Sequence, residues 1–173
     1  MRAALWCPIP LLLAMACSRA STRSTPVDEP PAPLRPSAPT TVPAVPTAPI
    51  TFTTAAGPLV IHAEVVKSPG RVQKGLMYRK YMPPDAGMLF LMGDVDDHHF
   101  WMHNTLIPLD IMFIDGDKRV VGILDNVQPL DETSRGVGAP SLYVLEVNGG
   151  WAKQHGISAG AQLAFGDVDA VAQ

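Results

Sequence analysis

The distribution of proline constrains this chain more than any other feature. Nine of its 18 prolines lie between residues 18 and 50, where serine, threonine, alanine and valine separate them. Proline lacks a backbone donor and fixes φ, so neither a helix nor a central strand continues through such a segment. We therefore expect residues 18–50 to form a Pro-rich, disordered linker, and we expect one globular domain over residues 51–173.

Residues 1–17 have the composition of a targeting segment. An arginine near the start is followed by apolar residues 3–16, a run too short and too interrupted by proline to predict a membrane span. Small residues precede Cys17, which resembles the end of a bacterial lipoprotein signal peptide. In such signals the cysteine is lipidated and becomes the new N-terminus. Ala14 stands where leucine is usual, and a plain secretory signal is the alternative.

The cysteine count agrees with a lipid anchor. The chain has only Cys7 and Cys17, and Cys7 would leave with the signal peptide. The rest of the chain therefore has no disulfide, thiol nucleophile or cysteine metal ligand. Acyl chains on Cys17 would each contribute about 0.8 kcal/mol per buried CH₂, so two or more give stable attachment. We expect a lipid-anchored protein of the cell envelope, with a soluble secreted or periplasmic protein as the alternative.

The charge of the chain argues against nucleic acid as a partner. The formal net charge is −3, and the basic residues are scattered. A phosphate-binding surface normally needs a local excess of lysine and arginine. We expect the partners to be the membrane, through the anchor, and a small molecule or an envelope protein.

Short β-branched and aromatic runs, separated by glycine and proline turns, fill the folded part. They predict a mainly β fold, a single compact barrel or sandwich-like domain with one or two short helices. Residues 93–97 read as an acidic loop, and Asp115–Lys118 reads as a hairpin turn. One-turn helices are expected at 71–74 and 151–155. The expected strands are 59–66, 88–92, 100–105, 111–115, 120–124, 142–147 and 162–165.

Several motifs are similar, in order, to those of the domain of unknown function 192 family. They are KGLMYR at 74–79, DAGMLF at 85–90, FWMHNT at 100–105, IPLD at 107–110 and YVLEVN at 143–148. The resemblance covers residues 58–166. It implies a compact, mainly β domain that is often secreted or anchored, and it implies no particular activity. His103 stands where the family commonly has lysine or arginine, so that position does not require a positive charge.

Asp110 interrupts the most apolar stretch outside the N-terminus, FWMHNTLIPLDIMFID. At period two, Leu109, Ile111 and Phe113 share one face, and both faces are otherwise apolar, which is typical of a strand covered on both sides. A carboxylate there must be neutralised or hydrogen-bonded. We expect Asp110 to be partly buried and held by Arg79 or by backbone N–H groups of the 104–107 turn.

The best-supported functional class is a module that binds a small ligand or a protein partner. Aromatic surface would supply affinity, and asparagine and arginine would orient the ligand. A purely structural role for the same residues is the alternative. No catalytic residue, metal ligand or cofactor is assigned. The ligand-binding or structural cluster comprises Arg79, Trp101, Met102, Asn104, Thr105 and Asp110.

Two other functions stay open. Six methionines between residues 77 and 112, together with His98, His99 and His103, are soft ligands that suit Cu(I). Methionine is also a common gap-filler in protein cores, and the histidines lack a recognised ligand spacing. A hydrolase would use Asp110 as nucleophile or base with His103 or His99 as its partner, although no nucleophile elbow or oxyanion motif is visible.

Overall fold

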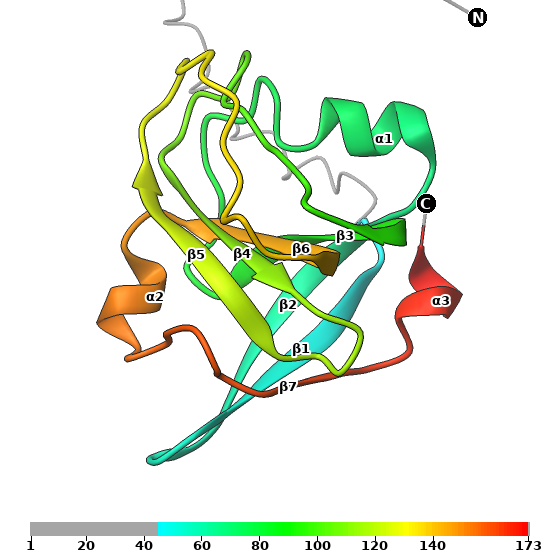
Figure 1. Cartoon of the computed structure of the whole chain (residues 1–173), viewed down its shortest axis with the longest axis vertical. Helices are drawn as coiled ribbons and strands as arrows, with labels where there is room; N and C mark the ends of the chain where they lie inside the picture. The colour runs from blue at the N-terminus through cyan, green and yellow to red at the C-terminus, as the bar shows by residue number, and fades with distance from the viewer. Residues whose placement is uncertain (1–44, 173) are drawn as a thin grey trace, which may run out of the picture. The chain divides into compact units, whose positions relative to one another are not determined.

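The computed structural model describes residues 45–172, which fold around one curled sheet (Figure 1). The order of the strands in the sheet is β5-β4-β6-β3-β2-β1-β7. The expected mainly β fold with short helices is confirmed. The expected signal peptide and most of the expected linker lie outside the described residues. The strands are β1 (Thr47–Thr54), β2 (Gly57–Val66), β3 (Ala86–Asp96), β4 (Leu109–Ile114), β5 (Val120–Val127), β6 (Ser141–Asn148) and β7 (Leu163–Phe165).

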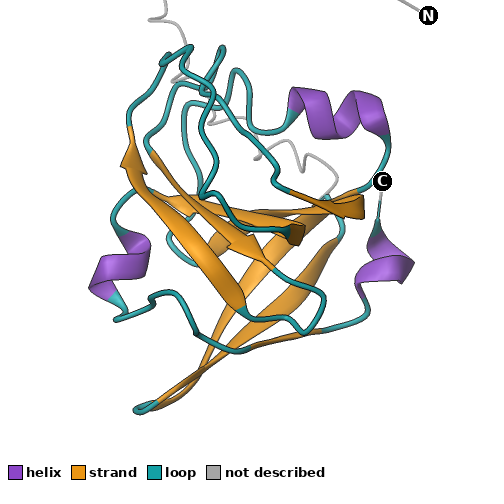
Figure 2. Cartoon of the chain, viewed as in Figure 1, coloured by secondary structure: helices purple, strands orange, loops and turns teal. Residues whose placement is uncertain are grey.

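The three helices lie at the periphery of the sheet (Figure 2). They are α1 (Pro69–Lys74), α2 (Trp151–Gln154) and α3 (Val168–Val171). Gly75 ends α1 with φ +45°, a conformation that glycine adopts without the steric cost of a Cβ. Within residues 45–172, no helix has both the length and the apolar character needed to cross a membrane.

The sheet curls because its two edge strands approach each other at one end. All neighbouring strands are antiparallel except β2 and β3, which run parallel and are connected through α1. The N–H of Leu163 donates to the carbonyl of Lys118 (2.9 Å), and the N–H of Val120 donates to the carbonyl of Ala161 (2.9 Å). These bonds join the start of β5 to the chain that enters β7.

Strand β4 is buried along its whole length and divides the core into two clusters. Leu109, Ile111 and Phe113 pack on one face, while Met112 and Ile114 pack on the other. The expected strand covered on both sides is therefore confirmed. Both clusters depend on β4, so this strand is the structural centre of the domain.

Two elements differ from the sequence-based expectation. Strand β1 begins at Thr47, inside the expected linker, and contains Pro49. The Pro49 carbonyl accepts the N–H of Gly166, just beyond the end of β7. The backbone of Pro49 therefore faces the end of the β1–β7 ladder. The backbone N–H that proline lacks is not needed there. Residues 100–105 are not a strand. Phe100 makes only an isolated bridge to Arg135, and the chain then turns at Asn104 with φ +54°.

Two smaller differences concern the ends of the sheet. The expected acidic loop at 93–97 is mostly the end of β3, which continues to Asp96. Helix α3 was not expected, and its first turn is capped by the side chain of Asp167, which accepts the N–H of Ala170 (3.1 Å). Such capping satisfies a backbone donor that the helix itself leaves unpaired.

Candidate functional site

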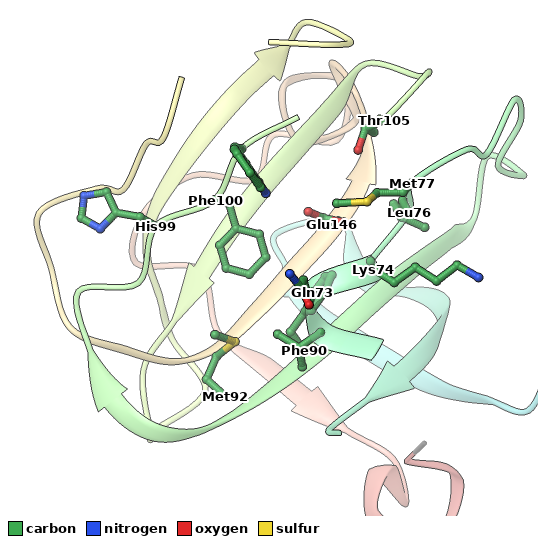
Figure 3. A pocket seen from close by; sticks show the side chains of 13 residues that line it. Gln73, Lys74, Leu76, Met77, Phe90, Met92, His99, Phe100, Thr105 and Glu146 are labelled. Atoms are coloured by element: carbon green, nitrogen blue, oxygen red, sulfur yellow. The ribbon is translucent and has the colours of Figure 1, made fainter. Parts of the chain in front are cut away.

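A small pocket lies between α1, the middle of the sheet and the segment that precedes β4 (Figure 3). Its volume is about 170 Å³. An engineered apolar cavity of about 150 Å³ accommodates benzene, so the pocket suits a ligand of that scale and is too small for a dinucleotide or a haem. Its lining is mostly apolar and aromatic: Val72, Gln73, Lys74, Gly75, Leu76, Met77, Phe90, Met92, His99, Phe100, Trp101, Thr105 and Glu146.

Glu146 is the only acidic residue in this lining, and the sheet places it there. It lies on β6, paired with Met88 of β3 and with Ile111 of β4, so it projects from the centre of the sheet. The residue is 5% exposed. Figure 3 shows its carboxyl group inside the pocket, with Phe100 on one side and Met77 on the other.

Burial dominates the chemistry of Glu146. Removing the carboxylate from water raises its pKa from 4.5 to about 8, and no hydrogen bond or neighbouring charge within residues 45–172 offsets that rise. The group is therefore largely protonated at neutral pH. It can donate an O–H to a ligand acceptor, or it can lose the proton and bind a cation. A buried acid with a strongly shifted pKa in a pocket marks a candidate functional site.

Glu146 was not among the residues expected at a site. The strand that holds Glu146 was expected. The signal that identifies Glu146, a carboxyl at an otherwise apolar strand position, is the same one that identified Asp110. At period two, Glu146 shares a face with Val144, which is buried in one of the two core clusters. A carboxyl on the apolar face of a central strand needs a partner.

Two members of the expected cluster, Trp101 and Thr105, do line the pocket. Trp101 is 46% exposed and stacks on His103, with ring centroids 4.8 Å apart. Thr105 is buried, and its hydroxyl donates to the carbonyl of His103 (3.4 Å). Phe100 makes an edge contact with Phe90 at 5.2 Å between centroids, which fixes the aromatic wall between them.

Asp110 lies elsewhere, in a different kind of site. It is fully buried, and its carboxylate accepts backbone N–H groups from Asn126 (2.7 Å), Gly150 (2.8 Å) and Ala152 (2.7 Å). The expectation that Arg79 or the 104–107 turn would hold it is wrong. The chain turns sharply after β6 and brings the N–H groups at the start of α2 onto this strand instead. These donors come from residues about 15 to 40 positions away, so no local motif announces them.

The remaining members of the cluster do not converge on Asp110. Arg79 binds Glu64 of β2 through two parallel hydrogen bonds of 2.5 and 2.6 Å, the fork geometry that arginine offers a carboxylate. Met102 is fully buried in the core. The side-chain amide of Asn104 donates to the hydroxyl of Tyr78 (2.8 Å), so Asn104 joins the turn to the chain after α1.

The methionines and histidines are dispersed. Four of the methionines pack in the core: Met82, Met88 and Met102 in one cluster, and Met112 in the other. Among the described residues, no group of three or more histidine, cysteine, aspartate or glutamate side chains is arranged to hold a metal ion. Asp110 has its carboxylate oxygens occupied by backbone donors, so it is poorly placed to act as a nucleophile or base.

Comparisons with solved structures place this fold among known proteins. A protein of unknown function from Novosphingobium aromaticivorans DSM 12444 is 40% identical, with a TM-score of 0.68 over 72% of this chain and 89% of that one. A suggested transcription regulator from Sinorhizobium meliloti 1021 is 37% identical, with a TM-score of 0.66 over 69% of this chain and 93% of that one.

A search among curated proteins found no match. The profile of the DUF192 family of uncharacterised proteins matches residues 51–165, which is more than half of the chain. The same residues hold all of the sheet except the start of β1, together with the pocket and both buried carboxyl groups described above. The chain therefore belongs to the DUF192 family.

Proposed function

We propose that this protein is a lipid-anchored protein of the cell envelope whose β domain binds a small ligand in the Glu146 pocket. Glu146 carries the proposal. A carboxyl that is nearly buried and receives no hydrogen bond from residues 45–172 is unfavourable, and an apolar side chain at the same position on β6 would avoid that penalty. A ligand that bonds to the carboxyl offsets the cost whenever it is bound, so the group makes sense as the polar anchor of a binding site.

The rest of the lining suits that role. Phe90, Phe100 and Met92 form apolar walls that would cover the ligand, and Trp101 stands exposed beside the pocket. A few placed polar groups among apolar walls are what small-molecule sites share. The binding class needs no catalytic group, and we assign none.

A fragment screen by ligand-detected NMR tests this proposal. We expect fragments with no more than about ten heavy atoms to bind the wild-type domain, in keeping with the ligand sizes that such small cavities hold. Glu146→Gln, which replaces the carboxyl with a neutral amide of the same shape, should weaken the binding of those with a polar group. Asp117→Asn is the matched control because it removes one charge from an exposed turn. The proposal would be contradicted if the wild-type domain bound no fragment, or if Glu146→Gln bound every fragment as tightly as the wild type does.

Copper(I) binding is the second candidate, and one observation favours it: Met77, Met92 and His99 all line the same pocket. Figure 3 shows these three side chains spread around the pocket rather than pointing at one place, which counts against a closed site. Metal analysis of the purified protein and a Cu(I) titration distinguish the two. Stoichiometric binding that is lost in Met77→Leu would favour copper.

We propose no nucleic-acid partner, although one similar structure is described as a suggested transcription regulator. Within residues 45–172 the longest helix has six residues, which is short for an element that reads the major groove. The net charge of −3 adds no attraction for phosphate.

A further inference from the structure

We propose that the ligand of the Glu146 pocket carries a positively charged nitrogen bearing methyl or other small alkyl groups, which pairs with the Glu146 carboxylate against the aromatic walls. This inference rests on the proposed function and adds the chemical class of the ligand. Three features of the pocket support it: its charge, its aromatic lining and its size.

The charge of the pocket is unbalanced. Glu146 shares the lining with two other titratable side chains, Lys74 and His99. Figure 3 shows the Lys74 side chain extending away from Glu146. The Nδ1 of His99 lies 2.9 Å from the carbonyl of Asp97, at the edge of the site. Since neither pairs with Glu146, a positive charge that stabilises the ionised form of Glu146 would come from the ligand.

The aromatic lining also favours a cation. Phe90, Phe100 and Trp101 contribute rings to the pocket, and ring faces attract cations within about 6 Å of the centroid. Alkyl groups on the nitrogen would meet these rings and the methionine side chains. Above about pH 8, where Glu146 is ionised, an anionic ligand would be repelled by the carboxylate, and a neutral ligand would gain one ordinary hydrogen bond. A cation gains a charge-assisted bond as well as the attraction of the rings.

The size of the pocket limits the ligand. A volume of about 170 Å³ holds a small substituted ammonium group and leaves no room for a folded peptide or a nucleotide. The ligand is therefore either a small free amine or the head of a longer molecule whose remainder stays outside.

This pairing makes binding depend on pH in a defined direction. Burial holds the pKa of the empty site at about 8, so a permanent cation must displace the Glu146 proton below that pH. Affinity should then rise about tenfold for each pH unit up to about 8 and become constant above it. Each binding event at neutral pH should release close to one proton.

Choline and its neutral carbon isostere, 3,3-dimethyl-1-butanol, make a matched pair of probes. Isothermal titration at several pH values between about 6 and 9, in buffers of different ionisation enthalpy, measures both affinity and proton release. We expect choline to bind at least about tenfold more tightly than the isostere at pH above 8. We expect Glu146→Gln to lose that preference and the pH dependence. Asp117→Asn, which removes a charge from an exposed turn outside the pocket lining, should keep both.

The outcomes separate this inference from the proposed function. If the isostere binds as tightly as choline, and fragments still require Glu146, the pocket binds neutral ligands and only the cation is wrong. If choline binds without releasing a proton, or equally well in Glu146→Gln, the pairing with Glu146 is refuted. If neither probe binds and the fragment screen is also negative, the proposed function fails together with this inference. A thermal melt of each variant confirms that the fold is retained.

Discussion

Asp110 and Glu146 are the two buried acidic residues among residues 45–172, and their surroundings are opposite. Asp110 accepts three backbone N–H groups, whereas Glu146 receives no hydrogen bond from residues 45–172. The first arrangement is complete and serves stability, because every oxygen has a donor. The second is incomplete and leaves a polar group available in a pocket. The contrast separates a structural carboxylate from a candidate binding group.

Replacing Asp110 should destabilise the domain strongly. Asp110→Ala leaves three backbone N–H groups without acceptors, and we expect a loss of about 3–5 kcal/mol in the free energy of unfolding. Asp110→Asn should lose about 2 kcal/mol, since its amide nitrogen would face at least one N–H donor. Urea unfolding measures both, with Asp117→Asn as a control that should stay within about 0.5 kcal/mol of wild type. If Asp110→Ala unfolded at the same urea concentration as the wild type, the structural role of Asp110 would be contradicted.

The raised pKa of Glu146 should make stability fall as pH rises. The folded state keeps its proton up to about pH 8, whereas the unfolded state loses it near 4.5. The stabilisation is therefore complete below about 4.5 and is lost as pH rises through 8, at about 1.4 kcal/mol per unit. Glu146→Gln should lack this decline. Unfolding midpoints for the two proteins should thus converge toward low pH and diverge toward pH 8, and parallel profiles would show that burial does not perturb this carboxyl.

At the residue scale, the burial of Asp110 could be predicted from the sequence, and its hydrogen-bond donors could not. Periodicity identified Asp110 as a polar group in a covered strand, and it is buried and satisfied. The donors could not be named, because they come from the turn after β6 and from β5. Arg79 looked like a natural partner by charge, but Glu64 on β2 lies closer to it in space. Chemical complementarity predicts that a partner exists, and only topology determines which one it is.

At the scale of elements, the close approach of β3 and β6 fixes the position of Glu146 in the pocket. Gly87 on β3 pairs with Val147 on β6. A Cβ added at Gly87 would lie 2.8 Å from the carbonyl oxygen of Glu146, closer than real Cβ contacts occur. The two strands can lie at this distance only because position 87 has no side chain.

Gly87→Ala should therefore disturb both stability and the site. The clash is with backbone, which cannot rotate away, so we expect a loss of about 2 kcal/mol and a displaced Glu146. Gly70→Ala is the matched control, since a Cβ there meets nothing within 4 Å and lies in α1. That control should be neutral or slightly stabilising. Thermal melts and choline titrations of both variants make the comparison, and equal melting temperatures would contradict it.

Sequence patterns predicted most strands but failed where a turn depends on distant residues. The alternation around β4 assigned each side chain to the correct cluster. Residues 100–105 look like a strand by composition, yet Asn104 adopts φ +54° and its carbonyl accepts the N–H of Tyr78. Tyr78 lies 26 residues earlier, and composition carries no information about that meeting. The expectation that Pro49 lies in the linker was wrong for a related reason. The sequence does not show that the β1–β7 ladder ends beside Pro49 and needs no N–H donor there.

At the scale of the whole molecule, the proposed lipid anchor on Cys17 and the proposed linker would set where the pocket operates. Cys17→Ser should move the protein from the membrane fraction, or the detergent phase of a Triton X-114 partition, into the aqueous phase, because the site of lipidation is lost. Cys7→Ser is the matched control, since that residue would leave with the signal peptide. Retention of Cys17→Ser in the membrane fraction would show that attachment does not depend on Cys17.

Strand β6 has a consequence for how this chain is made. It lies between β3 and β4, so the ladders β1-β2-β3 and β4-β5 have no strand in common until residues 141–148 are present. A ribosome that has released only the first 140 residues has therefore produced two separate ladders, in which the edges of β3 and β4 that β6 will pair with are still open. Such an intermediate is prone to aggregation and digestion. A premature stop codon before β6 should therefore leave no part of the domain folded. Holdase chaperones should be needed until β6 has been synthesised, because the middle of the sheet is completed late.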